Sequence, residues 1–70
     1  MKQYNILDYG AIADGVTNNA VAIQQAIDEA SVEGGRVVIP QGRYLSGTLI
    51  LKSNIDFHLE KGAVLVSSLN

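Results

Sequence analysis

The feature that most constrains the fold is a series of short β-prone runs, each closed by a turn signal, that fills the chain after Gly35. Two of these runs repeat at an offset of eight residues, because Leu51-Lys52-Ser53-Asn54-Ile55 aligns with Leu59-Glu60-Lys61-Gly62-Ala63. Asn and Gly, which end the two turns, are the residue types that best tolerate a positive φ. The chain is therefore expected to turn a corner at residues 54 and 62 and to keep one apolar face inward.

Strand-and-corner units of this length are typical of a parallel β-solenoid, in which about three sides form one coil. The same spacing also occurs in antiparallel sandwiches. The hairpin dipeptides Asn-Gly and Asp-Gly, which favour antiparallel pairing, do not occur between these runs. The pattern therefore favours a mainly β solenoid, with the sandwich as the alternative.

The expected strands form two groups, one at the start of the chain and one after a helix. In the alternating run 55–60, Ile55, Phe57 and Leu59 are expected to face inward, and the polar residues between them outward. The expected strands are residues 4–7, 36–39, 43–46, 48–52, 55–60 and 63–67.

Between these groups the hydrophobic period is that of a helix. The apolar stripe consists of Ala20, Ile23, Ala26, Ile27 and Ala30. Thr17 or Asn18 is expected as the N-cap, and Gly34-Gly35 as the stop. The sequence thus predicts one amphipathic α-helix at about residues 19–32.

Charge and hydropathy exclude several classes of function. The chain has 5 Lys and Arg against 7 Asp and Glu, and its basic residues are scattered, so we expect no nucleic-acid partner and no membrane partner. The longest apolar runs, such as 63–66, are far shorter than the roughly twenty residues of a membrane span. No signal peptide is visible, which leaves a cytoplasmic chain or a processed secreted one.

Residues with catalytic chemistry are few. With no Cys and one His, the chain has neither a thiolate nor a two-His metal site, and no metal or cofactor is expected. His58 is interpreted as a solvated outward strand residue. Sugar hydrolysis needs paired carboxylates, but Asp8 and Asp14 are interpreted as turn residues, and Asp56 and Glu60 as exposed, unpaired strand residues. No catalytic residue is assigned, and the substrate-binding residues stay unknown.

Three stretches of the chain carry a family resemblance. They are Asp8-Tyr9-Gly10-Ala11-Ile12-Ala13-Asp14-Gly15, Gly34-Gly35-Arg36-Val37-Val38-Ile39-Pro40 and Leu51-Lys52-Ser53-Asn54 with Phe57-His58-Leu59-Glu60-Lys61-Gly62. Together they resemble the opening segment of the pectin-lyase-like β-helix superfamily and, within it, glycoside hydrolase family 28, the polygalacturonases.

The resemblance implies the N-terminal part of a right-handed parallel β-helix, with the helix at 19–32 capping its end. It also implies a cell-wall hydrolase of carbohydrate metabolism, a glycosidase for pectin degradation whose partner is a polysaccharide or oligogalacturonide. In that family, aspartates hydrolyse α-1,4-galacturonan with inversion, on Asn-Thr-Asp, Asp-Asp, Gly-His-Gly and Arg-Ile-Lys motifs. None of these occurs here, and the similar Asn54-Ile55-Asp56 receives no catalytic role.

Stacked repeats generally need at least three coils, and this chain has about one and a half. Residues 1–70 are therefore expected to be the cap and first coil or coils of a longer enzyme and to be inactive alone. Two alternatives stay open for the parent protein. One is a non-hydrolytic solenoid, such as a tailspike-like polysaccharide-binding protein, and the other is a relative of the pectate lyases.

Overall fold

The computed structural model describes residues 2–67, which form five strands, one 3-10 helix and one α-helix. In chain order they are β1 (Gln3–Asn5), η1 (Ile6–Tyr9), α1 (Ala20–Glu33), β2 (Arg36–Ile39), β3 (Gly42–Ser46), β4 (Asp56–Leu59) and β5 (Ala63–Ser67). The described part of the chain is thus mainly strand with a single α-helix. That helix is not of the length and apolarity that a membrane span requires.

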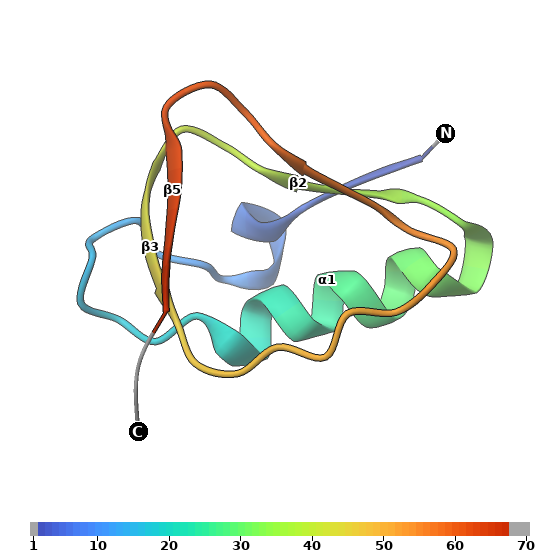
Figure 1. Cartoon of the computed structure of the whole chain (residues 1–70), viewed down its shortest axis with the longest axis horizontal. Coiled ribbons are helices and arrows are strands. Elements are labelled where there is room, and N and C mark those ends of the chain that lie inside the picture. The colour runs from blue at the N-terminus through green and yellow to red at the C-terminus, as the bar shows by residue number, and fades with distance from the viewer. Residues whose placement is uncertain (1, 68–70) are drawn as a thin grey trace.

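The strands stack in parallel, as the solenoid interpretation requires. β1, β2 and β4 form one sheet in that order, and β3 pairs with β5 in a second sheet. Paired residues are 20 positions apart in the β2–β4 pair, where Val37 is opposite Phe57. They are 21 positions apart in the β3–β5 pair, where Gly42 is opposite Ala63 (Figure 1). Parallel stacking is confirmed over the antiparallel sandwich.

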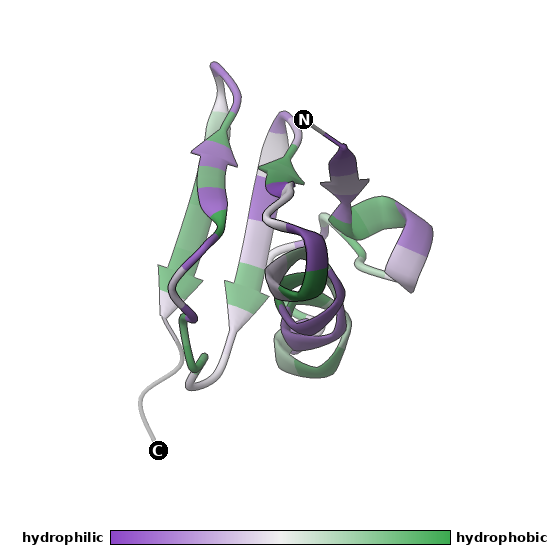
Figure 2. Ribbon diagram, turned by 90° about the vertical axis from the view of Figure 1, so that its right-hand side faces the viewer, coloured by the Kyte–Doolittle hydropathy of each residue, from purple (hydrophilic) through white to green (hydrophobic). Residues whose placement is uncertain are grey.

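The stack has three layers, which Figure 2 shows from the side. β4 and β5 form one outer layer, β2 and β3 the middle layer, and α1 lies with β1 and η1 on the other side. Four residues of the predicted apolar stripe, Ile23, Ala26, Ile27 and Ala30, are completely buried in the core, whereas Ala20 is only partly buried. The core that they share includes Val37, Ile39 and Tyr44, all of them also fully buried.

The ends of α1 match the prediction at one end only. Gly34, at φ 76°, ends the helix as expected. At the start, Asn19 is the N-cap, so the choice of Thr17 or Asn18 was wrong. The side chain of Asn19 binds Ile12 and makes no capping bond, and the neighbouring Asn18 accepts the Ala20 N–H at 3.0 Å instead.

Both predicted corners are present. Asn54 and Gly62 have φ values of 69° and 85°, in the left-handed region that Asn and Gly tolerate best. The inward side chains Ile55 and Phe57 are partly buried against the core. Leu59, also expected inward, is 41% exposed, because among the described residues nothing lies over it on the side away from β2.

Two predicted strands were wrong in part or in full. The strand expected at 4–7 ends at Asn5, whose side chain accepts the Leu7 N–H at 2.9 Å and starts η1. The strand expected at 48–52 does not form. Residues 47–55, which we call the strap, run beside α1, and a helix offers no strand edge with which they could pair (Figure 1).

Candidate functional site

The structure places the acidic residues considered from the sequence on different elements or in the loops beside them. Asp8 is on η1, Asp14 is in the loop before α1, Asp56 begins β4 and Glu60 follows it. Asp56 accepts from Arg36 Nε at 2.8 Å, so the expectation that it is unpaired was wrong. Its partner is the residue directly beneath it in the β2–β4 register, because outward side chains stack along the ladder.

Asp14 serves the local backbone. Its carboxylate accepts the N–H groups of Val16 and Thr17 at 2.9 and 2.7 Å, and the Thr17 hydroxyl at 2.7 Å. These bonds, chiefly those from Thr17, lower the pKa of Asp14 to about 2. A carboxyl that stays ionised in this way shapes the loop and is unsuited to be a general acid.

His58 is exposed on β4, above Val38, as the alternating pattern predicted. Within residues 2–67, no group of three or more His, Asp or Glu side chains is placed to hold a metal ion. The described residues therefore supply neither a metal centre nor a histidine base with an orienting partner.

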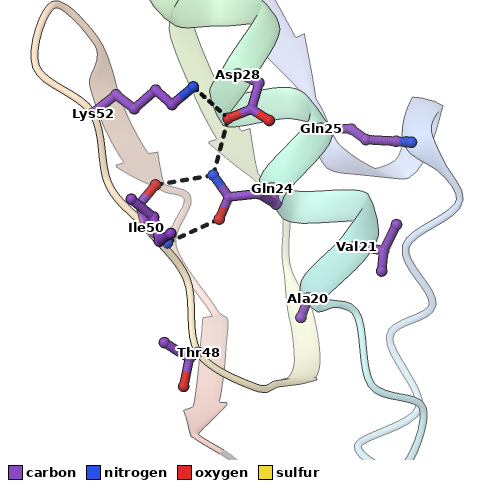
Figure 3. Close-up of a pocket in the computed structure, with 8 residues that line it drawn as sticks. All are labelled: Ala20, Val21, Gln24, Gln25, Asp28, Thr48, Ile50 and Lys52. Carbon is purple, nitrogen blue, oxygen red and sulfur yellow. Dashed lines mark hydrogen bonds and ion pairs between the residues drawn. The ribbon is translucent and has the colours of Figure 1, made fainter.

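A groove of about 670 Å³ lies between α1 and the strap. Figure 3 shows the eight residues that line it, of which Gln24 and Asp28 on the helix point toward Ile50 and Lys52 on the strap. The groove carries apolar surface, since Val21 and Ile50 are 74% and 68% exposed. The lining residues are Ala20, Val21, Gln24, Gln25, Asp28, Thr48, Ile50 and Lys52.

A compact polar cluster joins the two sides of this groove (Figure 3). The Gln24 side chain accepts the Ile50 N–H at 2.8 Å and donates to the Ile50 carbonyl at 3.0 Å. The same Gln24 nitrogen donates to Asp28 Oδ1 at 3.0 Å, and Lys52 Nζ lies 2.9 Å from that oxygen. The bonds from Gln24 and then Lys52 lower the pKa of Asp28. A neutral amide and an ionised, paired carboxylate can hold a chain segment, and a carboxyl that stays ionised is unsuited to be a general acid.

Sequence reasoning missed this cluster. Gln24 and Asp28 lie outside the apolar stripe of the predicted helix, on the side where polar residues usually face water. Their i, i+4 spacing, which places two side chains on one face, was the only available signal. Their partner Ile50 takes part through its backbone, which carries no signature in the sequence.

Two tyrosines fasten the N-terminal elements to the other side of α1. The Tyr4 hydroxyl donates to Glu33 at 3.0 Å, and the Tyr9 hydroxyl donates to Glu29 at 3.1 Å. Burial, followed by these hydrogen bonds, raises the pKa of both phenols. Both stay protonated donors at neutral pH, so their role here is to tie β1 and η1 to the helix.

Comparison with known proteins assigns the family. A family profile described as rhamnogalacturonase A/epimerase, pectate lyase-like, matches residues 3–60. The chain belongs to this family. The rhamnogalacturonase A/epimerase membership confirms the resemblance drawn from the sequence, and the relatives below confirm the similarity to the N-terminal part of family 28 polygalacturonases.

An exo-poly-α-D-galacturonosidase of Dickeya chrysanthemi is 46% identical over 69 residues, which are 99% of this chain and 11% of that protein. The family 28 exopolygalacturonase of Yersinia enterocolitica superposes with a TM-score of 0.91 at 51% identity, over 96% of this chain and 12% of that one. The plasmin and fibronectin-binding protein A of Streptococcus pneumoniae is 38% identical over 69 residues, 94% of this chain and 10% of that protein. This member of the rhamnogalacturonase A/epimerase family thus spans 10–12% of the length of these relatives.

Proposed function

We propose that residues 1–70 are the N-terminal portion of a polygalacturonase-like glycoside hydrolase that acts on α-1,4-galacturonan. The observation that carries this proposal is the 46% and 51% identity to two proteins whose names describe exo-acting galacturonan hydrolases. Because the chain covers 11% and 12% of them, the activity belongs to a longer protein of which this segment is one part.

Within that protein, the segment is the cap and first coil or coils of a right-handed parallel β-helix, and α1 covers its N-terminal end. The three-layer arrangement supports this role, because α1 covers one side of the β2 and β3 layer. On the other side, Leu59 of β4 remains 41% exposed, although Ile39 beneath it in β2 is fully buried. A further coil stacked there would bury the Leu59 side chain and pair the free strand edges.

The chemistry is inverting hydrolysis by aspartates that lie beyond this segment. Inversion needs two carboxyl groups about 6.5–9.5 Å apart, one protonated and one free to activate water. Asp14, Asp28 and Asp56 are each engaged by local donors or by a basic partner, which supports a structural role for this segment.

The test is an assay of the full-length protein on polygalacturonate, with the 1–70 chain as the control. We expect release of reducing ends whose first-formed anomer, observed by proton NMR, is inverted, and no turnover by the 1–70 chain alone. Unsaturated products that depend on calcium would instead identify a lyase. Turnover by the pure 1–70 chain would contradict the location of the chemistry.

A second candidate is a non-hydrolytic solenoid that binds its partner without cleaving it. The observation that favours it is the 38% identity to a pneumococcal protein named for binding plasmin and fibronectin. Saturable binding of galacturonan or of a protein by the full-length chain, with no product formed over a long incubation, would support this candidate over the hydrolase.

A further inference from the structure

We propose that the middle of the strap, residues 50–53, is closed onto α1 by a latch and opens from it while the strands at both ends of the strap stay paired. The latch consists of Gln24, Asp28 and Lys52, together with the backbone of Ile50. Opening widens the groove described above and exposes the side of α1 that the strap covers. This inference concerns the segment itself and holds whether or not the parent protein is a hydrolase.

The first support is that side chains supply every hydrogen bond found for the strap backbone. The Gly47 N–H donates to Asn18 Oδ1 at 3.0 Å, and Ile50 is held at both its N–H and its carbonyl by Gln24. Among the described residues, no β-ladder includes residues 47–55. Releasing one glutamine side chain therefore frees the central backbone of the strap.

The second support is that both ends of the strap are anchored independently of the latch. Before it, β3 is paired with β5 along its full length. After it, the Asp56 N–H donates to the Gly35 carbonyl at 3.0 Å, and β4 is paired with β2. Leu49 and Ile55 pack against the core, whereas the side chains of Ile50 and Leu51 are 68% and 62% exposed. Little apolar burial thus resists opening of the middle.

The third support is that the latch acts as one unit. Asp28 Oδ1 accepts from both Gln24 and Lys52, so the carboxylate holds the Gln24 amide in the orientation that Ile50 requires. The Asp28 and Lys52 side chains are 48% and 45% exposed, so salt screens this pair. The bonds between Gln24 and Ile50 join neutral groups, which salt affects little. The latch therefore has a salt-sensitive half and a salt-insensitive half.

The experiment is NMR amide hydrogen exchange in the full-length protein, with Gln24→Ala compared against Gln25→Ala. The first change removes both the acceptor of the Ile50 N–H and the donor to the Ile50 carbonyl. The matched control removes the neighbouring amide, on a side chain that points away from the strap (Figure 3). We expect the Ile50 amide to exchange about tenfold faster in Gln24→Ala and less than about twofold faster in the control.

The Asp56 amide is the internal reference, and its exchange should stay within about twofold of wild type in both variants. An unchanged Ile50 amide in Gln24→Ala would overturn the proposal. So would equal acceleration at Ile50 and Asp56, because the strap would then open only with the strands.

Lys52→Met provides a second test of the latch, because it removes the exposed partner of Asp28 and leaves the helix residues unchanged. We expect the Ile50 amide to exchange about two- to threefold faster in this variant, and its remaining exchange rate to be independent of salt. A variant in which Ile50 exchanges as in wild type would show that Asp28 and Lys52 do not belong to the latch.

Discussion

At two places among the described residues, an asparagine or glutamine side chain binds both backbone groups of one residue, as a strand partner would. Asn19 accepts the Ile12 N–H at 2.8 Å and donates to the Ile12 carbonyl at 3.0 Å, and Gln24 does the same for Ile50. Each such hydrogen bond contributes about 0.5–1.5 kcal/mol, so these amides stabilise segments that no strand can reach. Asn19 is only 2% exposed, although a single sequence gives no reason to distinguish it from a solvated loop residue.

Asp14 leads to a prediction about pH. Its pKa in the folded protein, about 2, lies below the ordinary value of 3.8, because Thr17 and Val16 donate to the ionised carboxylate. The ionised form therefore contributes stability above the ordinary value, and this contribution is lost as the pH falls through about 2. In Asp14→Asn, position 14 no longer titrates, so its part of the acid destabilisation should disappear.

The measurement is urea unfolding of wild type and Asp14→Asn at several pH values across this window, with the Asp14 carboxyl titrated by NMR. We expect the difference in unfolding free energy between the two proteins to shrink as the pH falls. A carboxyl that titrates near its ordinary pKa would contradict the hydrogen-bonded loop described above.

At the scale of single elements, the predictions were accurate where the residue types themselves indicate the local structure. The helical stripe placed α1 to within one residue at each end, and Asn54 and Gly62 marked corners with positive φ. The strand expected at 48–52 failed for a physical reason, since a β-strand needs a neighbouring strand and its neighbour is a helix. The β1 strand ended early because the side chain of Asn5 caps η1, a local competition that hydropathy does not reveal.

The inward face of α1 gives a prediction about stability. Ile27→Ala should lower the unfolding free energy by about 2–5 kcal/mol, because the site is fully buried and the deletion leaves a cavity in the shared core. Val21→Ala on the same helix is the control, and it should change stability by less than about 0.5 kcal/mol because Val21 is 74% exposed. Chemical denaturation of the full-length variants measures both, and equal effects would contradict the face assignment.

At the scale of the whole molecule, the parallel stacking and the family were predictable because each rests on a pattern spread over most of the chain. The polar contacts of the candidate site were not predictable. Neither the cluster of Gln24, Asp28 and Lys52 nor the ion pair of Asp56 with Arg36 was expected. That pair joins residues 20 positions apart, which are opposite each other in the β2–β4 register. The offset of eight seen in the sequence relates successive sides of one coil, so it does not indicate which residues stack on one another.

Asp56 provides a test of whether a carboxylate of this segment takes part in the reaction. It lies in Asn54-Ile55-Asp56, which resembles a catalytic motif, yet its carboxylate is bound to Arg36 at the start of β4. Under the proposed function, Asp56→Asn in the full-length protein should keep kcat/KM for galacturonan within about twofold of wild type. It should lower the unfolding free energy by less than about 1 kcal/mol, because the ion pair is partly exposed.

Steady-state kinetics and urea unfolding of the same preparation provide both values. Arg36→Gln removes the other partner and should give an equally small loss of stability. A loss of activity of several orders of magnitude in Asp56→Asn alone would place the carboxylate in the reaction.

The step of 20 residues between stacked strands also bears on synthesis at the ribosome. At about 5–20 residues per second, one such step takes about 1–4 s to translate, far longer than a helix or a short loop needs to form. α1 and the β1–β2 pair lie entirely within the first 39 residues, so they can assemble before β4 has been made. Each new strand then emerges beside a strand edge that has already folded, so the segment can fold in the order in which it is translated.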